Sequence, residues 1–190
     1  RERLVIFDAD GTIIDAFHAI EQTFLTHGMA IGDLERFQKR RKLLKYLGGL
    51  REFPTNLRRQ FGKQHRKRLL ATLTEIYRNE ASLYPGIVSL LRVLLAAPDI
   101  RVGLVTRNVT VEPEVTLTCL FERHGIDLGD FDYFACIPLR EEKTGQLKKA
   151  RERLAINPAR AYACGDEYSD YIAAIGAGMR SEEASCRERV

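Results

Sequence analysis

Two aspartates near the start of the chain have a spacing suited to phosphate chemistry. Asp8 and Asp10 follow the apolar residues 4–7 (LVIF), and Gly11 comes next. On a strand that is ending, two such carboxylates can face one cavity, and a glycine permits a turn where a side chain would crowd a ligand. One carboxylate can attack phosphorus to form an acyl phosphate, while the other protonates the leaving alcohol and later deprotonates water. The pair therefore predicts one nucleophile and one proton shuttle.

The same D-x-D-G pattern has two other interpretations, an ordinary Asx-type turn and a calcium loop. A calcium loop needs further oxygen ligands at alternate positions and a late bidentate glutamate, whereas the apolar Ile13 and Ile14 follow here. The context favours catalysis over calcium binding, and a simple turn stays open as the alternative.

A second polar position follows the apolar segment Arg101 to Thr106 (RVGLVT). The Thr106 hydroxyl and the backbone N–H groups beyond it, at Arg107 and Asn108, can hold phosphate oxygens at the carboxyl end of a strand. Many strands end in threonine, so this signal is weak by itself.

A third group of polar residues is the segment GDEYSD at positions 165–170, which follows the strand-like residues 161–164. Asp166 is placed to bind a hard cation such as Mg²⁺. Asp170 can position a metal-bound water or orient the basic residue that balances the site. The alternative for Asp170 is an acid in the first turn of a helix.

The elements that must carry these residues alternate between strand and helix. Continuously apolar segments predict strands, and longer periodic segments between them predict helices, a pattern typical of βαβ units with a parallel sheet. The strands are expected at 4–7, 101–106, 133–136 and 161–164, and the helices at 86–97, 112–124, 145–154 and 168–178. The predicted fold is α/β with a Rossmann-like parallel sheet core.

The first two expected strands are separated by far more residues than one crossover helix needs. Residues 16–81 show helical spacing without strand alternation, for example at Phe17, Ile20, Phe24 and Leu25. We interpret 16–81 as an inserted all-helical cap domain and residues 1–15 and 82–179 as the core domain.

Taken together, the motifs resemble those of the haloacid dehalogenase superfamily, in its phosphatase type with a helical cap, as in phosphoglycolate phosphatase. The matching features are D-x-D-G-T at 8–12, a threonine after the second strand, a lysine and G-D-x-x-x-D at 165–170, in the family's order between Val5 and Met179. The resemblance implies Asp8 as nucleophile and metal ligand and Asp10 as general acid and base that lends its backbone carbonyl to Mg²⁺.

The resemblance also implies roles for the remaining residues. Asp166 completes the protein ligands of Mg²⁺, and Thr106, with Arg107 and Asn108, binds the substrate phosphate. Supporting roles fall to Gly11, Thr12, Gly165, Glu167 and Asp170.

The family's lysine is assigned to Lys143, at the start of an expected helix. Lys148 and Lys149 are the alternatives, but Leu147 and Ala150 lie on the apolar face of that helix, which turns both lysines elsewhere. A threonine replaces the family's usual proline after Lys143, which leaves the loop less rigid.

Asp10 favours phosphate chemistry within the family, because relatives that cleave carbon–halogen bonds generally lack a carboxylate at that position. We therefore expect a Mg²⁺-dependent phosphate monoester hydrolase that acts on a small phosphorylated metabolite through an aspartyl-phosphate intermediate. A phosphomutase similar to β-phosphoglucomutase is an alternative.

The charge distribution suggests one further alternative. Residues 16–80 hold 14 lysines and arginines against 6 acids, whereas the whole chain has a formal charge of +4. The basic clusters at 39–42 and 65–68 are expected to be solvated helix faces, with docking on nucleic-acid ends as a second hypothesis. Few aromatic residues accompany the charge, which argues against nucleic acid.

The remaining features bound the setting of the protein. The four cysteines lie far apart and predict neither a disulfide framework nor a zinc site. We expect no signal peptide or membrane span, and therefore a cytoplasmic protein. Residues 180–190 (RSEEASCRERV) lack apolar periodicity, so we expect a tail that is non-native or disordered and supplies no strand.

Overall fold

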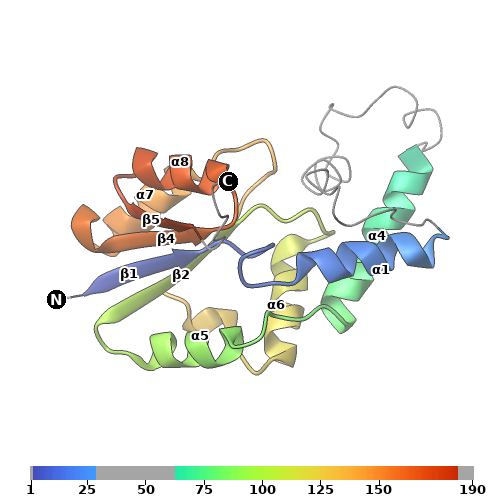
Figure 1. Cartoon of the computed structure of the whole chain (residues 1–190), viewed down its shortest axis with the longest axis horizontal. Helices are drawn as coiled ribbons and strands as arrows, with labels where there is room; N and C mark the ends of the chain where they lie inside the picture. The colour runs from blue at the N-terminus through green and yellow to red at the C-terminus, as the bar shows by residue number, and fades with distance from the viewer. Residues whose placement is uncertain (1, 29–62, 184–190) are drawn as a thin grey trace, which may run out of the picture. The chain divides into compact units, whose positions relative to one another are not determined.

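Five parallel strands form one sheet (Figure 1). The structure is a computed structural model that describes residues 2–28 and 63–183. The strand order is β3-β2-β1-β4-β5. The strands are β1 Arg3–Phe7, β2 Ile100–Thr106, β3 Tyr133–Cys136, β4 Ala161–Gly165 and β5 Arg180–Glu183. This confirms the predicted α/β, Rossmann-like parallel sheet.

Helices connect these strands in the predicted alternation. They are α1 Ala16–Thr26, α4 Lys63–Asn79, α5 Ile87–Ala96, α6 Pro113–Arg123, α7 Thr144–Arg153 and α8 Tyr168–Gly176, with short 3₁₀ turns η2 Leu128–Asp130 and η3 Pro158–Arg160. Within the described residues, no helix is long and apolar enough to cross a membrane.

Strand β1 occupies the middle of the sheet. Val5 lies opposite Val102 of β2 and opposite Tyr162 of β4. The chain leaves β1 at Asp8, whose N–H donates to the Cys164 carbonyl oxygen at 2.9 Å. Because all strands run parallel, the carboxyl ends of β1, β2 and β4 meet at one edge, which gathers the polar segments that follow them.

Helices α7 and α8 lie on one face of the sheet, and α5 lies on the other (Figure 1). The core beneath α7 and α8 consists of aliphatic and small side chains that are at most 6% exposed, including Leu4, Ile6, Leu147, Ala150, Ala163, Ala173 and Ala174. Alanine has no bulk beyond Cβ, so these helices can lie close to the strands. Their packing holds the strand ends that carry the polar residues.

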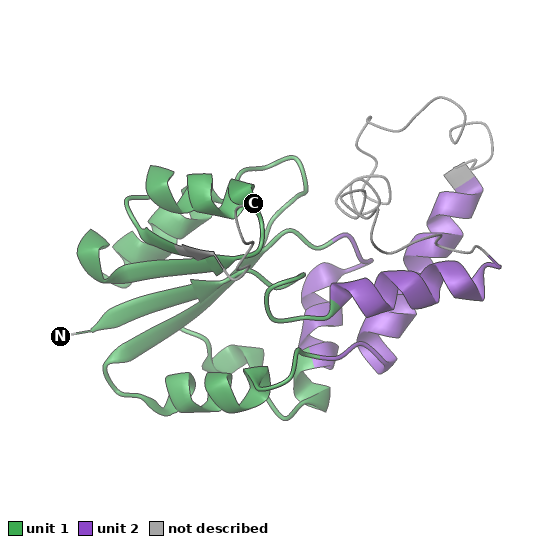
Figure 2. Ribbon diagram, viewed as in Figure 1, with its two compact units in different colours: residues 1–15, 83–108, 121–190 green, residues 16–82, 109–120 purple. Residues whose placement is uncertain are grey.

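The chain divides into two compact units (Figure 2). The first contains the sheet and comprises residues 1–15, 83–108 and 121–190, and the second comprises 16–82 and 109–120. The sequence places 109–120 in the core domain, whereas the structure groups this segment with the second unit. One reason is that the guanidinium of Arg78 on α4 bonds the Thr116 hydroxyl at 3.1 Å and the Val111 carbonyl oxygen at 3.3 Å.

The described elements of the second unit are helical. Ile20 and Phe24 of α1 are buried, as their spacing indicates, but Leu25 is 51% exposed. The basic cluster 65–68 lies on α4, and the cluster 39–42 lies outside the described residues.

Strand β5 corrects one prediction. The sequence predicts no strand for residues 180–190, yet Arg180 pairs with Tyr162 and Glu183 with Gly165 along β4. The prediction is wrong for 180–183 because main-chain groups make the pairing at a sheet edge, where charged side chains are common and apolar periodicity is not required. The Arg180 guanidinium also lies 5.8 Å from the centre of the Tyr162 ring. Residues 184–190 lie outside the described part of the chain.

Candidate active site

A tight turn follows β1 and fixes the two aspartates of the first motif. The N–H groups of Ile13 and Ile14 both donate to the Ala9 carbonyl oxygen, at 3.0 and 2.9 Å. Gly11 has a φ of 83°, a left-handed conformation that glycine adopts without a steric penalty. The turn therefore sets the main-chain positions of Asp8 and Asp10.

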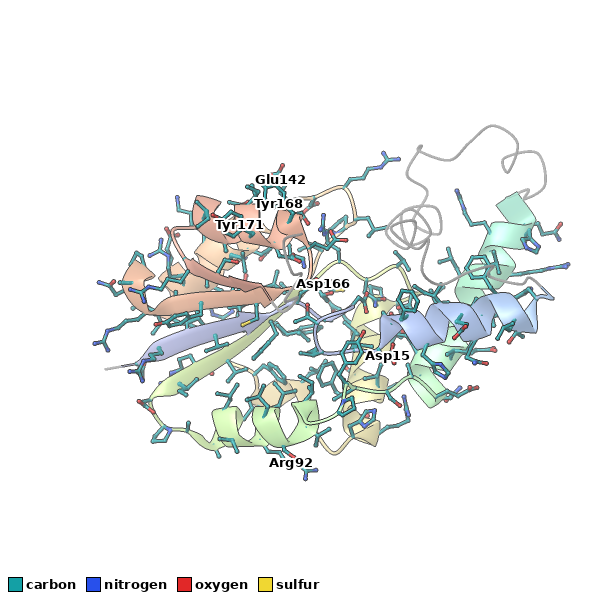
Figure 3. All side chains as sticks on the ribbon, in the orientation of Figure 1. Asp15, Arg92, Glu142, Asp166, Tyr168 and Tyr171 are labelled. Carbon is teal, nitrogen blue, oxygen red and sulfur yellow. The ribbon has the colours of Figure 1, made fainter. Side chains whose placement is uncertain are left out.

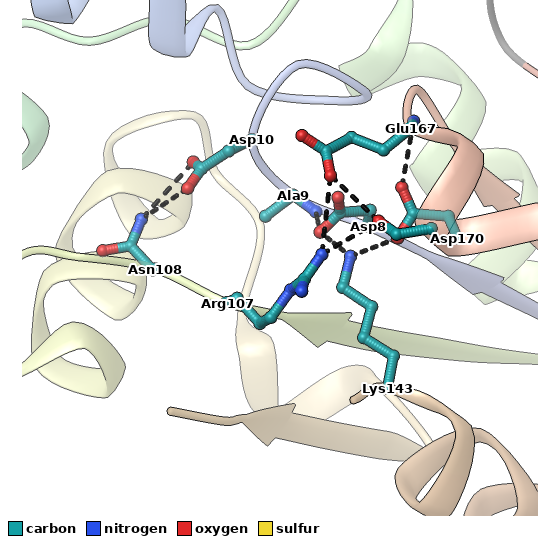
Figure 4. Close-up of polar contacts among 9 residues, drawn as sticks. Asp8, Ala9, Asp10, Arg107, Asn108, Lys143, Glu167 and Asp170 are labelled. Carbon is teal, nitrogen blue, oxygen red and sulfur yellow. Dashed lines mark hydrogen bonds and ion pairs between the residues drawn. The ribbon is translucent and has the colours of Figure 1, made fainter. Parts of the chain in front are cut away.

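Asp8 forms a buried ion pair with Lys143, the first residue before α7 (Figure 4). The Lys143 Nζ atom lies 2.7 Å from Oδ1 of Asp8 and 2.7 Å from Oδ1 of Asp170. Lys143 is only 5% exposed, whereas the side chain of Lys148 is 60% exposed and has Glu152 as its ion-pair partner at 3.9 Å. Of the three candidate lysines, the structure brings Lys143 to the aspartates.

Burial and charge act in opposite directions on this pair. Burial raises the pKa of Asp8, and the neighbouring Lys143 ammonium partly offsets that rise. Burial alone would lower the pKa of Lys143, but the carboxylates of Asp8 and Asp170 outweigh it, so the pKa is raised. Lys143 is therefore a permanent cation at neutral pH, and it favours the ionised form of Asp8.

Asp170 is held at the start of α8 from two sides. Its Oδ2 atom accepts the Glu167 N–H at 3.1 Å, while Oδ1 accepts from Lys143. Gly165 makes this approach possible, because a Cβ atom at position 165 would lie 2.5 Å from Cγ of Asp170. Asp170 thus acts both as a helix-start acid and as a partner of the lysine, which unites the two interpretations of its role.

Three carboxylates are close enough to share one metal ion. Among the described residues, Asp8, Asp166 and Asp170 each place an oxygen within 4.8 Å of the others. An all-oxygen, anionic donor set suits a hard divalent cation. The side chain of Asp166 is labelled in Figure 3. The glycine at position 11 leaves space for this side chain, because a Cβ atom there would lie 2.6 Å from the Oδ2 atom of Asp166.

Asp10 lies apart from this carboxylate group. Its oxygens accept from Nδ2 of Asn108, at 3.0 Å for Oδ2 and 3.4 Å for Oδ1 (Figure 4). Lys143 thus contacts Asp8, whereas the amide of Asn108 contacts Asp10. The implied contribution of Asp10 to the metal is its backbone carbonyl, and the side-chain group of three does not include it.

Two threonines, one at the end of β2 and one in the turn after β1, have buried hydroxyl groups without a hydrogen-bond partner among the described residues. Within the described residues, the Oγ1 atoms of Thr106 and Thr12 have no hydrogen-bond partner. Thr106 is the last residue of β2 and is fully buried. Because buried hydroxyls are nearly always bonded, these two groups suit a ligand that supplies acceptor oxygens, such as phosphate.

Arg107 bridges the loops after β2 and β4. Its NH2 atom lies 3.1 Å from Oγ of Ser169 and 3.5 Å from Oε2 of Glu167, and the Ser169 hydroxyl donates to Glu167 at 2.9 Å. The sequence predicts Arg107 as a substrate ligand and gives no role to Ser169. In the sequence, the serine two residues after Glu167 is the signal that could have indicated this contact.

Comparison with protein families assigns the chain to a known family. The sequence model of the haloacid dehalogenase-like hydrolases matches residues 2–178. The chain belongs to this family of hydrolases. The residues that the sequence analysis assigns to the motifs of this haloacid dehalogenase-like hydrolase, Asp8, Thr106, Lys143 and Asp166, lie within the matched range.

Solved structures share the fold of this hydrolase. CbbY from Rhodobacter sphaeroides in complex with phosphate is 22% identical, with a TM-score of 0.62, covering 95% of this chain and 85% of that chain. A putative phosphoglycolate phosphatase from Lactobacillus plantarum is 20% identical, with a TM-score of 0.61 and coverages of 95% and 84%.

A third structure with the same fold is that of a dehalogenase. The L-2-haloacid dehalogenase from Xanthobacter autotrophicus, with chloropropionic acid covalently bound, is 17% identical, with a TM-score of 0.63 and coverages of 100% and 80%. Identities this low establish the fold and leave the reaction to the site residues. A comparison with curated proteins gave no match.

Proposed function

We propose that this hydrolase cleaves phosphate monoesters of small metabolites through an aspartyl-phosphate intermediate on Asp8, with Mg²⁺ as cofactor. The observation that carries the proposal is the difference between the two aspartates of the first motif. Asp8 is ion-paired with the buried Lys143 and belongs to the carboxylate group, whereas Asp10 is bonded to the amide of Asn108.

The surroundings of Asp8 suit a nucleophile. A carboxylate attacks phosphorus only when ionised, and the ammonium of Lys143 stabilises that form in a buried place where it would otherwise be unfavourable. The same ammonium can neutralise charge on an incoming phosphate. Lys143 therefore has two tasks, which fits its position between Asp8 and Asp170.

Asp8, Asp166 and Asp170 are the side chains that can hold the metal or orient its ligands. Mg²⁺ prefers oxygen ligands, and the three oxygen sites lie within the reach of one ion. When bound, Mg²⁺ would neutralise charge on the phosphate and on the attacking carboxylate.

Asp10 suits proton transfer, because the amide of Asn108 contacts its carboxyl group without bringing a charge to it. In the first step, an oxygen of Asp8 bonds to phosphorus, the bond from phosphorus to the ester oxygen breaks, and Asp10 gives its proton to the leaving alkoxide. In the second step, Asp10 takes a proton from water, the hydroxide attacks phosphorus, and inorganic phosphate leaves Asp8. Both aspartates then regain their starting states.

The substrate phosphate would be bound by groups at the strand ends. The unbonded hydroxyl of Thr106 supports this assignment, together with the ammonium of Lys143 and the guanidinium of Arg107. The carboxylate at Asp10 favours phosphate esters over carbon–halogen bonds, which need no protonation of the leaving group.

A Mg²⁺-dependent assay on a panel of phosphate monoesters tests the proposal. The parent should release phosphate with Mg²⁺ and stop when EDTA is added. Asp8→Asn should abolish turnover, and Asp10→Asn should lower it by on the order of 10²- to 10⁴-fold. Asp130→Asn, an exposed aspartate of η2, serves as the matched control and should keep full activity. Undiminished turnover in Asp8→Asn would overturn the mechanism.

A further inference from the structure

The contact between Asn108 and Asp10 has no part in the mechanism given so far. Asn108 is 6% exposed and follows the end of β2 by two residues, so its amide joins the loop after β2 to the turn after β1. The sequence predicts that Asn108 binds the substrate phosphate. In the structure, its amide nitrogen is directed at the carboxyl group of Asp10 instead (Figure 4).

We propose that Asn108 is a positioning residue for Asp10, which fixes the carboxyl group that transfers the proton, and that it is not a phosphate ligand. The inference rests on the proposed function and deepens it, because it assigns a residue to the protonation step alone.

The hydrogen bonds of the turn after β1 do not by themselves fix the side chain of Asp10. These hydrogen bonds fix the main chain around Asp10, but the carboxyl group still rotates about two side-chain bonds. Proton transfer needs the donor within hydrogen-bond distance of the leaving oxygen, and a displacement of about 1 Å can cost about 10²-fold in rate. The amide nitrogen of Asn108 lies within 3.4 Å of both Asp10 oxygens and so restricts this rotation.

The chemical type of the partner also fits proton transfer. An asparagine amide carries no titratable proton, so it can hold a carboxyl group without fixing the protonation state of that group. Asp8 provides the contrast within the same site, because its partner Lys143 is a cation that favours the ionised form. A contact of this type suits a residue that must be acid in one step and base in the next.

The two roles for Asn108 predict different dependence on the leaving group. Every monoester carries the same phosphoryl group, so a lost phosphate ligand lowers turnover of all substrates alike. A misplaced proton donor affects alkyl phosphates, whose alkoxide leaving group is strongly basic, far more than p-nitrophenyl phosphate, whose leaving group needs little protonation.

The experiment compares kcat/KM for these two substrates in the parent, Asn108→Ala and Asp10→Asn. Asn108→Ala should lose on the order of 10- to 100-fold on the best alkyl phosphate of the panel and less than about threefold on p-nitrophenyl phosphate. Asp10→Asn should show the same selectivity with larger losses. The double variant should be no worse than Asp10→Asn, because both changes remove one function.

A matched control separates positioning from general destabilisation. Asn157 caps η3, where its Oδ1 accepts the Ala159 N–H at 2.9 Å, so Asn157→Ala also loses a side-chain hydrogen bond. It should leave the ratio of the two kcat/KM values unchanged. The ratio is measured within one preparation and is independent of the folded fraction.

Two outcomes would contradict the inference in distinguishable ways. Equal losses on both substrates in Asn108→Ala, with an active parent, would overturn the positioning role and return Asn108 to the phosphate ligands. A parent without Mg²⁺-dependent turnover of either substrate would overturn the proposed function, and this inference with it.

Discussion

A methyl group on Gly11 would lie 2.6 Å from the Oδ2 atom of Asp166, closer than real Cβ contacts come. The turn after β1 and the loop after β4 therefore approach each other too closely for a side chain at position 11. We expect Gly11→Ala to displace Asp166 from the carboxylate group. We expect a higher Mg²⁺ concentration for half-maximal activity, and a loss of about 1–2 kcal/mol in the free energy of unfolding from the left-handed backbone. A Mg²⁺ titration of activity and a denaturation curve measure the two effects.

Gly86→Ala is the control for this prediction. Gly86 has a φ of 86°, against 83° for Gly11, but a Cβ atom there meets nothing within 4 Å. It should lose similar stability and keep the parent's Mg²⁺ dependence. If both variants respond to Mg²⁺ as the parent does, the close approach of Gly11 and Asp166 has no functional weight.

Replacing Lys143 by methionine should strongly destabilise the fold. The change leaves Asp8 and Asp170 as buried carboxylates without their cation, which typically costs about 3–5 kcal/mol. Lys148→Met removes a lysine from the exposed face of the same helix and should change stability by no more than about 0.5 kcal/mol. Urea denaturation of the three proteins in EDTA measures the difference, and equal midpoints would show that the buried pair adds no stability.

The stabilisation by Lys143 should depend on pH at the alkaline end. The pKa of Lys143 is raised in the folded protein, so its contribution is fully present below 10.5, the ordinary lysine value, and is lost as the pH rises beyond it. The gap in unfolding free energy between the parent and Lys143→Met should be constant from neutral pH to about pH 9.5 and shrink above about pH 11. A gap that stays constant in strong alkali would contradict the raised pKa.

Neutralising Asp166 should have opposite effects with and without Mg²⁺. Saturation of the parent at about 100 times the dissociation constant should add about 2.7 kcal/mol to stability, and Asp166→Asn should lose most of this gain. Without metal, Asp166→Asn should be at least as stable as the parent, because one like charge has left the group. Thermal unfolding in EDTA and in Mg²⁺ gives both values, with Asp130→Asn as the control that keeps the full gain.

Asp132 should matter for stability away from the active site. Its Oδ2 atom accepts the N–H of the buried Val102 at 2.8 Å, and Oδ1 accepts from Arg101 at 3.0 Å. Asp132→Asn weakens the second bond and can leave the first without a charged acceptor, so we expect a loss of about 1–3 kcal/mol. Asp130→Asn, two residues earlier and exposed, should be neutral. A denaturant midpoint unchanged in Asp132→Asn would refute this role.

Much of the core fold was predictable from the sequence, because its signals are local. Buried parallel strands have continuously apolar segments, so the ranges of β1, β2, β3 and β4 were expected to within one residue at each end. The carboxyl-end rule then placed the polar motifs at one edge of the sheet. Strand β5 was not predicted, because main-chain pairing requires no apolar pattern in the sequence. The grouping of 109–120 with the helical unit was not predicted either, because it depends on contacts of Arg78 from a helix that is distant in the sequence.

The sequence indicates which polar residues gather at this edge of the sheet, but it does not indicate their pairings. The order of the motifs points to Asp8, Lys143 and Asp166, yet one sequence does not show whether an amide near a strand end faces the substrate or another side chain. Asn108 illustrates this, because its donor reaches Asp10 only after the loop of β2 meets the turn of β1. The close contact between the backbone of Gly165 and the side chain of Asp170 likewise could not be predicted from the residue types.

The central place of β1 has a consequence for how the chain folds. Leu4 pairs with Arg101 on one side and with Ala161 on the other, so the strand that carries the nucleophile is completed by segments far along the chain. Contacts between such distant residues slow folding, because the entropy of closing the long intervening loops is lost before the contacts contribute stability. During synthesis, β1 leaves the ribosome before β2 and β4, and its edges stay unpaired until those strands emerge, so catalytic competence should be among the last properties that a new molecule acquires.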